Sequence, residues 1–490
     1  MDFSLLWHNI TSLLSYSPES PMIFSSGTFW ALFLLFMPMY ALLKNSRYKM
    51  MLFVVAFSLY FYYKSSGWFF LLLVGTSLFD WTLSRVLVKR AKEWQRKLCV
   101  ATSIVASLGV LCYFKYANFF LENWAQIVGD NFQPLDIILP VGISFYTFQS
   151  ISYIVDVYRG RVAPTDSWLE YAFFLSFFPA LVAGPIVRAD YFLPQVKQNR
   201  RALPNEIWLG MWLILLGVLK KALIADYISQ YNDLVFVQPE VYQGVESLMG
   251  VVGYTMQIYC DFSGYSDMAI GIALIMGFRL SPNFNFPYKS TNLTEFWHRW
   301  HISLSSWLRD YVYIPLGGNR KGSIRTYVNN FLTMLIGGLW HGASWKFVFW
   351  GAMHGVGLAV HKLFKPLLKG IPDNWAVKTL SWLLTMSCVA FLWIFFRADS
   401  WSDAWFITTN IFTNFHADYL PVFLQVRYVW CIFMALLIAA HAMPEGWWSR
   451  MGERFVRAPW IVKLLVFVVV VQLVLQFKSE EVTPFIYFQF

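Results

Sequence analysis

The chain has 490 residues, of which 58% are hydrophobic, 20% aromatic and only 13% charged. Soluble domains carry about 25% charged residues, so this chain has too little polar surface for a soluble protein of its length. Its 24 Trp, 26 Tyr and 46 Phe suit a protein that crosses two water–lipid interfaces. Composition therefore excludes a secreted disulfide scaffold, a disordered protein and an ordinary cytosolic enzyme.

The net charge is +10, from 38 Lys and Arg against 28 Asp and Glu. The basic residues form short clusters between apolar runs, which favours a positive-inside bias and contact with anionic lipid headgroups over nucleic-acid binding. The five cysteines show no close pairing and are expected to be small core residues, not a disulfide or metal set. Residues 1–43 lack a basic start and carry Asp2 and Glu19, so we expect an interfacial segment over 1–27 and an uncleaved first span.

Charge-free apolar windows predict an all-α polytopic membrane protein, folded as one integral-membrane domain over 1–490. Because a spanning helix needs about 20 apolar residues, we expect roughly ten to twelve membrane-embedded helices, some of them shorter than a full span. The windows are 20–43, 50–63, 65–79, 98–114, 137–155, 171–187, 326–345, 347–364, 379–396, 404–417, 428–444 and 464–477, with weaker candidates at 207–219 and 247–278.

The distribution of basic residues predicts the orientation of the first spans, but the alternation of loops between the two sides of the membrane does not continue along the chain. Basic loops at 44–49 and 85–97 flank two apolar segments and are both expected in the cytoplasm, whereas the loop 116–136 has three acids and no Lys or Arg. The alternation breaks at 171–187, because basic residues that look cytoplasmic both precede and follow it. We therefore expect a re-entrant segment there or nearby, which is tolerated only where protein or a watery cavity surrounds it.

The polar stretch 281–325 is anomalous in such a chain. Residues 281–288 are too rich in Pro and Asn for a helix. Thr291 or Asn292 can cap a helix that has Glu295 in its first turn. Helical spacing then continues to Tyr311, and this element is too polar to face lipid, so it lies at an interface or lines a cavity.

Histidines mark the chemistry that this polar element can carry. His298 and His301 are three apart and are expected to be neighbours on one helical face, with His298 at an interface. His341 lies in the C-terminal part of the next apolar window, 326–345, and is flanked by Gly337, Gly338 and Gly342, which let a backbone or ligand approach. Trp340 and Trp345 can shield this histidine from lipid. An ionisable residue at membrane depth is a functional-site candidate, whereas a lone core histidine is the ordinary alternative.

The remaining titratable residues point less clearly to a function. His354 and His361 share a helical face, and His8, His416 and His441 have no supporting context. Asp261 and Asp267 can handle protons or cations, but a structural role in bonding Ser and backbone groups is the more ordinary interpretation. A three-histidine metal site at His298, His301 and His341 is possible in principle, but there is no HExxH motif or repeated His box, and eight histidines are few for that class. Walker A, Rossmann and G-x-S-x-G motifs are also absent from the sequence.

A set of seven motifs resembles the membrane-bound O-acyltransferase family, most closely its bacterial branch of membrane subunits for alginate O-acetylation. The resemblance covers roughly residues 20–480, with one departure, His298, where this branch has Arg. The motifs are LPVGISFYTFQ at 139–149, DVYRG at 156–160, FPALVAGPI at 178–186, DFSGYSD at 261–267, WHISLSSWLRDY at 300–311, IPLGGN at 314–319 and LWHGASW at 339–345.

The resemblance implies a ring of tilted helices with re-entrant and interfacial helices around a central funnel, and an active-site region over 281–361. It matches His341 to the active-site histidine and His301 to the second histidine of the family. The expected supporting or substrate-binding residues are Trp340, Trp345, Asn292, Ser303, Arg309 and Asp310.

By the same resemblance, a cytoplasmic thioester donor, acetyl-CoA or an acyl carrier, gives its acyl group to an extracytoplasmic acceptor polysaccharide across a bacterial inner membrane. We expect no bound cofactor and no metal, and a separate extracytoplasmic esterase-like partner protein. Arg299, Arg309, Arg320 and Lys321 can hold donor phosphates, although headgroup contact explains them equally well. The alternatives are D-alanyl or peptidoglycan acylation, a proton-coupled transporter, and a non-catalytic scaffold.

Overall fold

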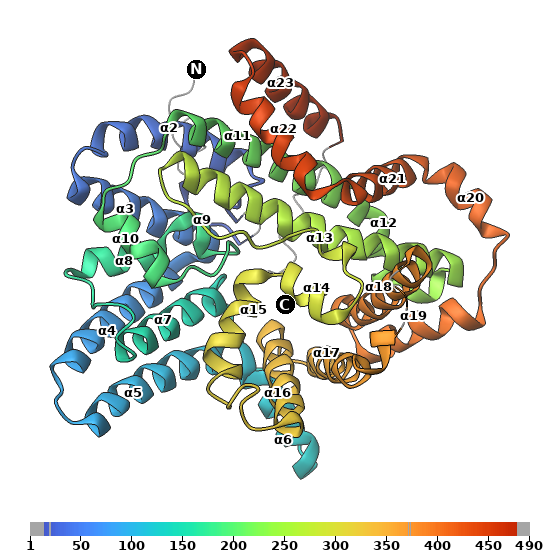
Figure 1. Cartoon of the computed structure of the whole chain (residues 1–490), viewed down its shortest axis with the longest axis horizontal. Helices are drawn as coiled ribbons and strands as arrows, with labels where there is room; N and C mark the ends of the chain where they lie inside the picture. Colours follow the sequence, from blue (N-terminus) through green and yellow to red (C-terminus); the bar gives the residue numbers. More distant parts are fainter. Residues whose placement is uncertain (1–13, 19–20, 371, 373, 478–490) are drawn as a thin grey trace. The chain divides into compact units, whose positions relative to one another are not determined.

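A computed structural model describes residues 14–18, 21–370, 372 and 374–477, and these residues form helices and connecting segments without any strand (Figure 1). The chain divides into two compact units. The first runs up to Ile214 and includes Met268–Ser281, and the second contains Leu215–Asp267 and the residues from Pro282 on. The expectation of one integral-membrane domain over 1–490 stays a prediction.

The first unit is built from short and long helices packed through aromatic side chains. Its elements are α2 Gly27–Leu43, α3 Arg47–Ser66, η1 Gly67–Phe69, α4 Phe70–Lys89, α5 Glu93–Leu111, η2 Cys112–Tyr116, α6 Ala117–Val128, α7 Ile143–Tyr158, α8 Trp168–Ser176, α9 Phe178–Leu181, α10 Ala189–Lys197 and the start of α11 Pro204–Val218.

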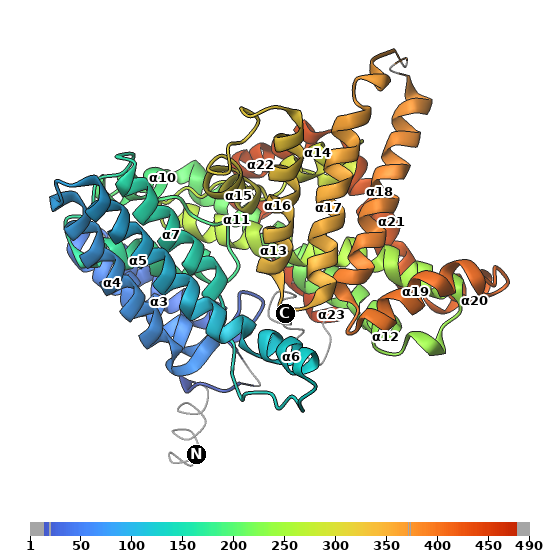
Figure 2. The same ribbon diagram turned by 90° about the horizontal axis from the view of Figure 1, so that it is seen from below.

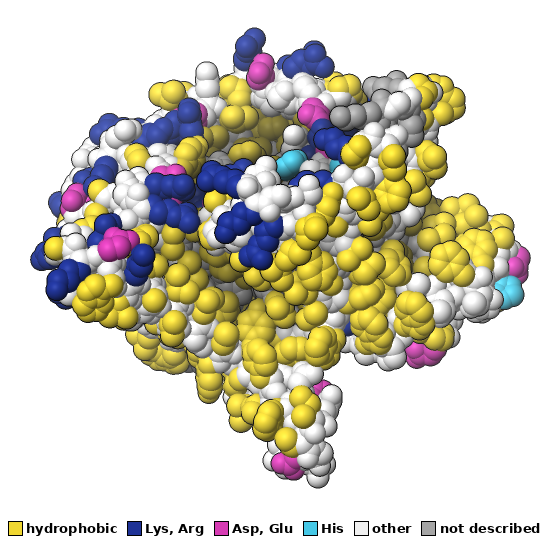
Figure 3. All heavy atoms as spheres, turned by 60° about the horizontal axis from the view of Figure 1, so that its bottom comes forward, with side chains coloured by type: hydrophobic (Ala, Val, Ile, Leu, Met, Phe, Trp, Pro, Cys, Tyr) yellow, Lys and Arg dark blue, Asp and Glu magenta, His cyan; other side chains and the backbone are white. Residues whose placement is uncertain are grey.

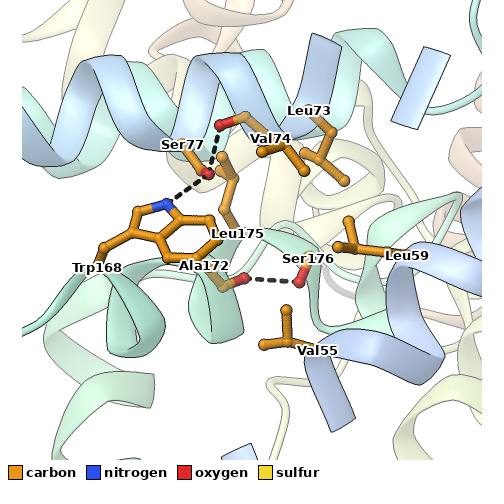
Figure 4. Close-up of a pocket in the computed structure, with 9 residues that line it drawn as sticks. All are labelled: Val55, Leu59, Leu73, Val74, Ser77, Trp168, Ala172, Leu175 and Ser176. Carbon is orange, nitrogen blue, oxygen red and sulfur yellow. Dashed lines mark hydrogen bonds between the residues drawn. The ribbon is translucent and has the colours of Figure 1, made fainter. Parts of the chain in front are cut away.

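Helices α3, α4 and α8 illustrate the density of this packing. The cavity between them measures only about 10 Å³ and is lined by Val55, Leu73 and Leu175 among others (Figure 4). The indole of Trp168 closes one side, because its Nε1 donates a hydrogen bond of 3.0 Å to Ser77 Oγ. A space of this size holds at most one water molecule, so it offers no site for a substrate.

The second unit carries the polar stretch and both candidate histidines. Its elements are η3 Leu219–Ala225, α12 Asp226–Val237, η4 Pro239–Val241, most of α13 Gly244–Ile275, η5 Pro287–Lys289, α14 Leu293–Arg299, α15 Ile302–Leu308, η6 Arg309–Tyr313, α16 Ser323–His341, α17 Trp345–Phe364, η7 Leu367–Gly370, α18 Trp375–Arg397, α19 Trp401–Thr413, α20 Tyr419–Val426, α21 Tyr428–Ala442, α22 Glu445–Arg457 and α23 Trp460–Phe477.

Among the described residues, six helical segments are long and apolar enough to cross a membrane, or seven if the bent pair α20–α21 forms one span. The sequence-based count of ten to twelve embedded helices is approximate, and one shorter apolar helix, Gly27–Leu43, adds to these segments. Hydrophobic side chains cover much of the face seen in Figure 3, and Lys and Arg side chains gather in separate clusters on it. The chain is therefore a multi-pass membrane protein. The six segments are Arg47–Lys89, Glu93–Val128, Pro204–Val237, Trp345–Phe364, Trp375–Arg397 and Trp460–Phe477.

The window 171–187 behaves as the failed alternation predicts. Helix α8 has nine residues and α9 only four, so at 1.5 Å per residue neither can cross a bilayer. Both helices are buried throughout apart from Trp168, and protein therefore surrounds this non-spanning segment. The first apolar helix, α2, has 17 residues, and most of the expected interfacial segment 1–27 lies outside the described residues.

Helices α16 and α17 cross at glycine, and both views show them side by side (Figures 1 and 2). A Cβ on Gly338 would lie 2.3 Å from the carbonyl oxygen of Phe347 and 2.8 Å from the Cα of Gly351. The glycines near His341 therefore allow the backbone of α17 to approach, as the sequence predicts. This crossing fixes the end of α16, where His341 lies.

Candidate active site

The polar helix expected through Tyr311 is broken at His301, which corrects the sequence-based prediction. Helix α14 ends at Arg299 and α15 begins at Ile302, while His301 has a φ of 43°. This left-handed conformation is costly for a residue with a Cβ and is concentrated at functional sites. Because the helix breaks, His298 and His301 do not share a helical face. His298 lines a cavity, whereas His301 is fully buried.

Asn283 holds the imidazole of His301. Its side-chain oxygen lies 3.1 Å from His301 Nδ1, and the same oxygen accepts hydrogen bonds from Ser303 Oγ at 2.8 Å and from the Ser303 backbone N–H at 3.2 Å. The Asn283 backbone carbonyl accepts a further bond from Ile302 N at 2.9 Å. The segment before α14 therefore holds the start of α15 in place, and Ser303 lies beside His301.

These contacts fix the tautomer of His301. A backbone N–H can only donate, so the Asn283 atom that meets Ser303 N must be the oxygen, and this oxygen can only accept. His301 Nδ1 therefore carries the proton and Nε2 carries the lone pair. Burial lowers the pKa of His301 to about 3, so its ring is neutral at physiological pH.

His341 is the last residue of α16 and is surrounded by aromatic rings. Its side chain is 3% exposed, and its ring centroid lies 4.9 Å from Trp340, 5.0 Å from Trp350 and 5.2 Å from Phe396, all edge-on. Such a box has low polarity, which strengthens any charge interaction formed inside it. The ring does not open to solvent within this unit.

Trp340 lies between the two candidate histidines in the contact network. Its ring is 6.0 Å from that of His301 as well as 4.9 Å from that of His341. The structure therefore brings together both residues expected to be catalytic, together with Trp340 and Ser303. The neighbouring indole of Trp350 buries its Nε1–H with no acceptor among the described residues, and an orphaned buried donor is costly unless a ligand satisfies it.

A cavity of about 350 Å³ lies between α14, α15, α16 and α17. Polar and cationic side chains, among them His298, Arg309 and Lys362, form part of its lining, and Trp297 and Leu308 form part of its apolar wall. It is large enough for a substantial part of an organic ligand.

The cavity ends close to His341. Leu308 lines it, and the Leu308 Cδ1 atom lies 3.1 Å from the position of a Cβ on Gly337, one helical turn before His341. Trp297, in the same wall, has its ring 5.6 Å from that of Trp350, which contacts His341. Two side chains, Trp297 and Trp350, thus lie between a ligand in the cavity and His341 on this side.

The other predicted site residues have different environments. Asn292 caps α14 by accepting from Glu295 N at 2.9 Å, as predicted, and so serves the local fold. Trp345 was expected to shield His341 from lipid. Its side chain is instead 61% exposed. Arg309 and Asp310 pair with each other at 2.8 Å, with Arg309 at the cavity.

Arg299 is occupied by carboxylates. It pairs with Glu295 at 3.0 Å and with Glu445 at 2.5 Å, so its charge is used within the protein and it is a poor candidate for donor phosphates. The hydrogen bond from Arg299 holds the pKa of the Glu445 carboxyl below its usual range.

The two acids of the DFSGYSD motif pair with adjacent lysines. Lys221 Nζ lies 2.5 Å from the Asp261 carboxylate and 2.8 Å from Asp226, and Lys220 Nζ lies 2.7 Å from Asp267. These ion pairs favour the structural interpretation over proton or cation handling. No three His, Cys, Asp or Glu side chains in the described part of the chain cluster as metal ligands would.

Sequence reasoning missed three residues that the structure makes prominent. Asn283 lies in the stretch 281–288, for which the sequence predicts only the absence of a helix. An Asn in an irregular segment next to a His-bearing element could have indicated a hydrogen bond to that histidine. His354 is fully buried and accepts from Trp297 Nε1 at 3.3 Å. His441 is buried and accepts from the backbone N–H of Tyr288 at 3.1 Å, a tertiary contact that no local pattern could reveal.

Known proteins similar to this chain are acyltransferases. A model of the MBOAT, membrane-bound O-acyltransferase family matches residues 163–397. The probable alginate O-acetylase AlgI of Pseudomonas aeruginosa is 42% identical over 395 residues, covering 78% of this chain and 74% of that protein. The peptidoglycan O-acetyltransferase of Helicobacter pylori is 38% identical over 387 residues (74% and 73%), and the teichoic acid D-alanyltransferase of Bacillus subtilis is 31% identical over 273 residues (53% and 68%).

These similarities favour neither a transporter nor a scaffold. They extend over most of the chain and include the polar stretch, the helix that ends at His341 and the paired acids. The chain therefore belongs to the membrane-bound O-acyltransferase family and is an O-acyltransferase.

Proposed function

We propose that this protein moves an acetyl group from a cytoplasmic thioester donor across the bacterial inner membrane, for O-acetylation of an extracytoplasmic polysaccharide, with His341 as the general base. The observation that carries the proposal is the pair of buried histidines, His301 and His341, joined by Trp340 beside a polar cavity.

Acyl transfer from a thioester to a hydroxyl needs a base and stabilisation of the oxyanion. His341 takes the proton from the attacking hydroxyl. The new C–O bond forms, the C–S bond breaks, and the proton passes from His341 to the departing thiolate. Positioned proton transfer of this kind contributes about 10²–10⁴ in rate.

His301 orients the hydroxyl that is acylated. Its Nδ1–H is directed to Asn283, so the neutral ring has an acceptor at Nε2 and no second donor. It can therefore receive a hydrogen bond from a substrate hydroxyl but cannot donate one to an oxyanion. The buried indole N–H of Trp350 next to His341 is the better oxyanion donor.

The 350 Å³ cavity suits the donor. Arg309 and Lys362 in its lining can bind phosphate groups of coenzyme A or of a carrier's phosphopantetheine arm. The thioester end then approaches Gly337 past Leu308, and a shift of the Trp297 and Trp350 side chains admits it to His341.

The acceptor polymer is proposed from similarity. Relatives of this chain include a probable alginate O-acetylase and a peptidoglycan O-acetyltransferase, and we favour alginate or a similar envelope polysaccharide. D-alanyl transfer is the second candidate, since a teichoic acid D-alanyltransferase is 31% identical to this chain over 273 residues. An extracytoplasmic esterase-like partner completes the transfer to the polymer.

The test is acyl transfer from labelled acetyl-CoA by purified protein in detergent. His341→Ala should fold and insert yet lose activity by about 10²-fold or more. The matched control is His416→Ala, because His416 is exposed and lies at the surface next to Asp418, 3.8 Å away. Full activity of the His341 variant would remove the base assignment, and release of D-alanine but not acetate would favour the second candidate.

A further inference from the structure

A second, larger cavity lies in the same unit and has no part in the acyl-transfer proposal. It measures about 790 Å³ and is lined by residues of α13, α18, α19, α21 and the short η5. The four α-helices are labelled in Figure 2. An acetyl group needs far less room than this, and the volume is typical of sites for large organic ligands.

The cavity is long and has two different ends. Along α18 its lining runs from Trp382 to Ile394, which is about 18 Å at the rise of an α-helix. The Trp382 end is polar, because Trp382 Nε1 donates to the Tyr288 carbonyl at 2.7 Å and His441 accepts from Tyr288 N. The Ile394 end is formed mainly by apolar residues, among them Leu248 and Ile411.

Lys289 is the cation at the polar end. Its ammonium donates to the backbone carbonyl of Met443, and no carboxylate lies within 4 Å of it in the described structure. The nearby Glu445 is held by Arg299. Burial lowers the pKa of Lys289 below its usual value, which is the sign of a cation without a full counter-charge.

The position of the polar end matches a membrane surface. Helix α22 follows Met443 almost directly and carries Trp447 and Trp448 together with exposed Arg450 and Arg454. Trp and Arg on a short amphipathic helix are typical of the headgroup level. The cavity therefore starts at the interface, and its length of about 18 Å is close to half of the ~30 Å hydrocarbon core.

The wall opens sideways to lipid. Phe412, Ile438 and Trp382 line the cavity and are nevertheless 81%, 51% and 40% exposed. We propose that this cavity binds one anionic glycerophospholipid of the surrounding membrane, with its phosphate against Lys289 and an acyl chain extending past Met386 toward Ile394. Lysine is a good point charge for a phosphate, and the remaining lining suits a hydrocarbon chain.

The experiment measures bound lipid, so it is independent of acyl transfer. The purified full-length protein is exchanged into detergent with equal dioleoylphosphatidylglycerol and dioleoylphosphatidylcholine, and retained lipid is counted by native mass spectrometry. The wild type should retain about one phosphatidylglycerol. Lys289→Glu should weaken this retention by about tenfold or more, and Ala390→Trp should remove it, since Ala390 lines the middle of the cavity.

Two matched variants serve as controls. Lys365→Glu reverses an exposed charge at the end of α17, and Ala435→Trp adds an indole to an exposed position of α21 outside the cavity; both should bind as the wild type does. If the Lys289→Glu variant unfolds, Lys289→Gln is measured in its place, since it removes the positive charge without adding a negative one. Equal retention of the two lipids would overturn the headgroup assignment, and retention unchanged in Ala390→Trp, or no retained lipid in the wild type, would overturn the site.

Discussion

The side-chain oxygen of Asn283 lies 3.1 Å from His301 Nδ1 and fixes which nitrogen of that ring carries the proton. This contact joins a segment without regular structure to a histidine in a left-handed conformation. The hydrogen bond and the left-handed backbone together fix the position of the imidazole, because a strained backbone persists only where the surrounding contacts hold it.

Asn283→Ala should reduce kcat with little change in KM. The variant removes the acceptor that orients His301, and the loss of one such hydrogen bond is worth about 0.5–1.5 kcal/mol, or up to about tenfold in rate. Asn283→Asp keeps the oxygen and should retain the orientation, but its charge raises the pKa of His301. The pH–rate profile of Asn283→Asp should therefore shift while that of Asn283→Ala does not, and identical profiles would contradict an orienting role.

Protonation of His301 should make the protein less stable in acid. Burial lowers the pKa of His301 to about 3, whereas a histidine in an unfolded chain titrates near 6.5. Between these two pH values the unfolded chain binds a proton at this histidine and the folded chain does not. The free energy of unfolding therefore falls as the pH drops from about 6.5 toward 3, and no loss from His301 is expected above pH 6.5.

The measurement compares thermal unfolding of the wild type and His301→Gln in detergent at pH 7.5 and pH 5. The wild-type midpoint should decrease more between the two pH values than that of the variant, because only the wild type carries this titration. Equal decreases would show that His301 is not the buried neutral group described above.

Sequence patterns predicted which residues come together better than they predicted the geometry. The cap at Asn292 and the position of His341 near the end of an apolar helix follow from local rules of hydropathy and capping, and the structure confirms both. The break at His301 was not predictable from periodicity, because a tertiary contact from Asn283 overrides the helical spacing. The lysines that pair with Asp261 and Asp267 were likewise hidden, since ion pairs between distant helices leave no local pattern.

Filling the smaller cavity should weaken donor binding selectively. Thr333 lines it on α16 and is buried, so Thr333→Trp should raise the KM for the thioester donor by about tenfold or more, with a smaller effect on the KM for the acceptor. Val328→Trp is the matched control, since Val328 lies on the same helix, is 41% exposed and does not line the cavity. An unchanged donor KM in Thr333→Trp would place the donor elsewhere.

Removing the charge of Lys221 should destabilise the protein more than removing the charge of an exposed lysine. Lys221 is 2% exposed and holds both Asp226 and Asp261, so Lys221→Met leaves two carboxylates without their cation. Breaking a buried ion pair from one side typically costs about 3–5 kcal/mol. The midpoint of thermal unfolding should therefore fall strongly, whereas Lys365→Met, at an exposed position, should leave it unchanged.

Asp261→Asn separates the two interpretations of this cluster. It keeps the side-chain shape, and Lys221 still has Asp226 as a partner at 2.8 Å, so the loss of stability should be smaller than in Lys221→Met and acyl transfer should persist in the folded fraction. A stable Asp261→Asn variant without activity would instead show that the carboxylate handles protons during turnover, because a purely structural ion pair affects activity only through the amount of folded protein.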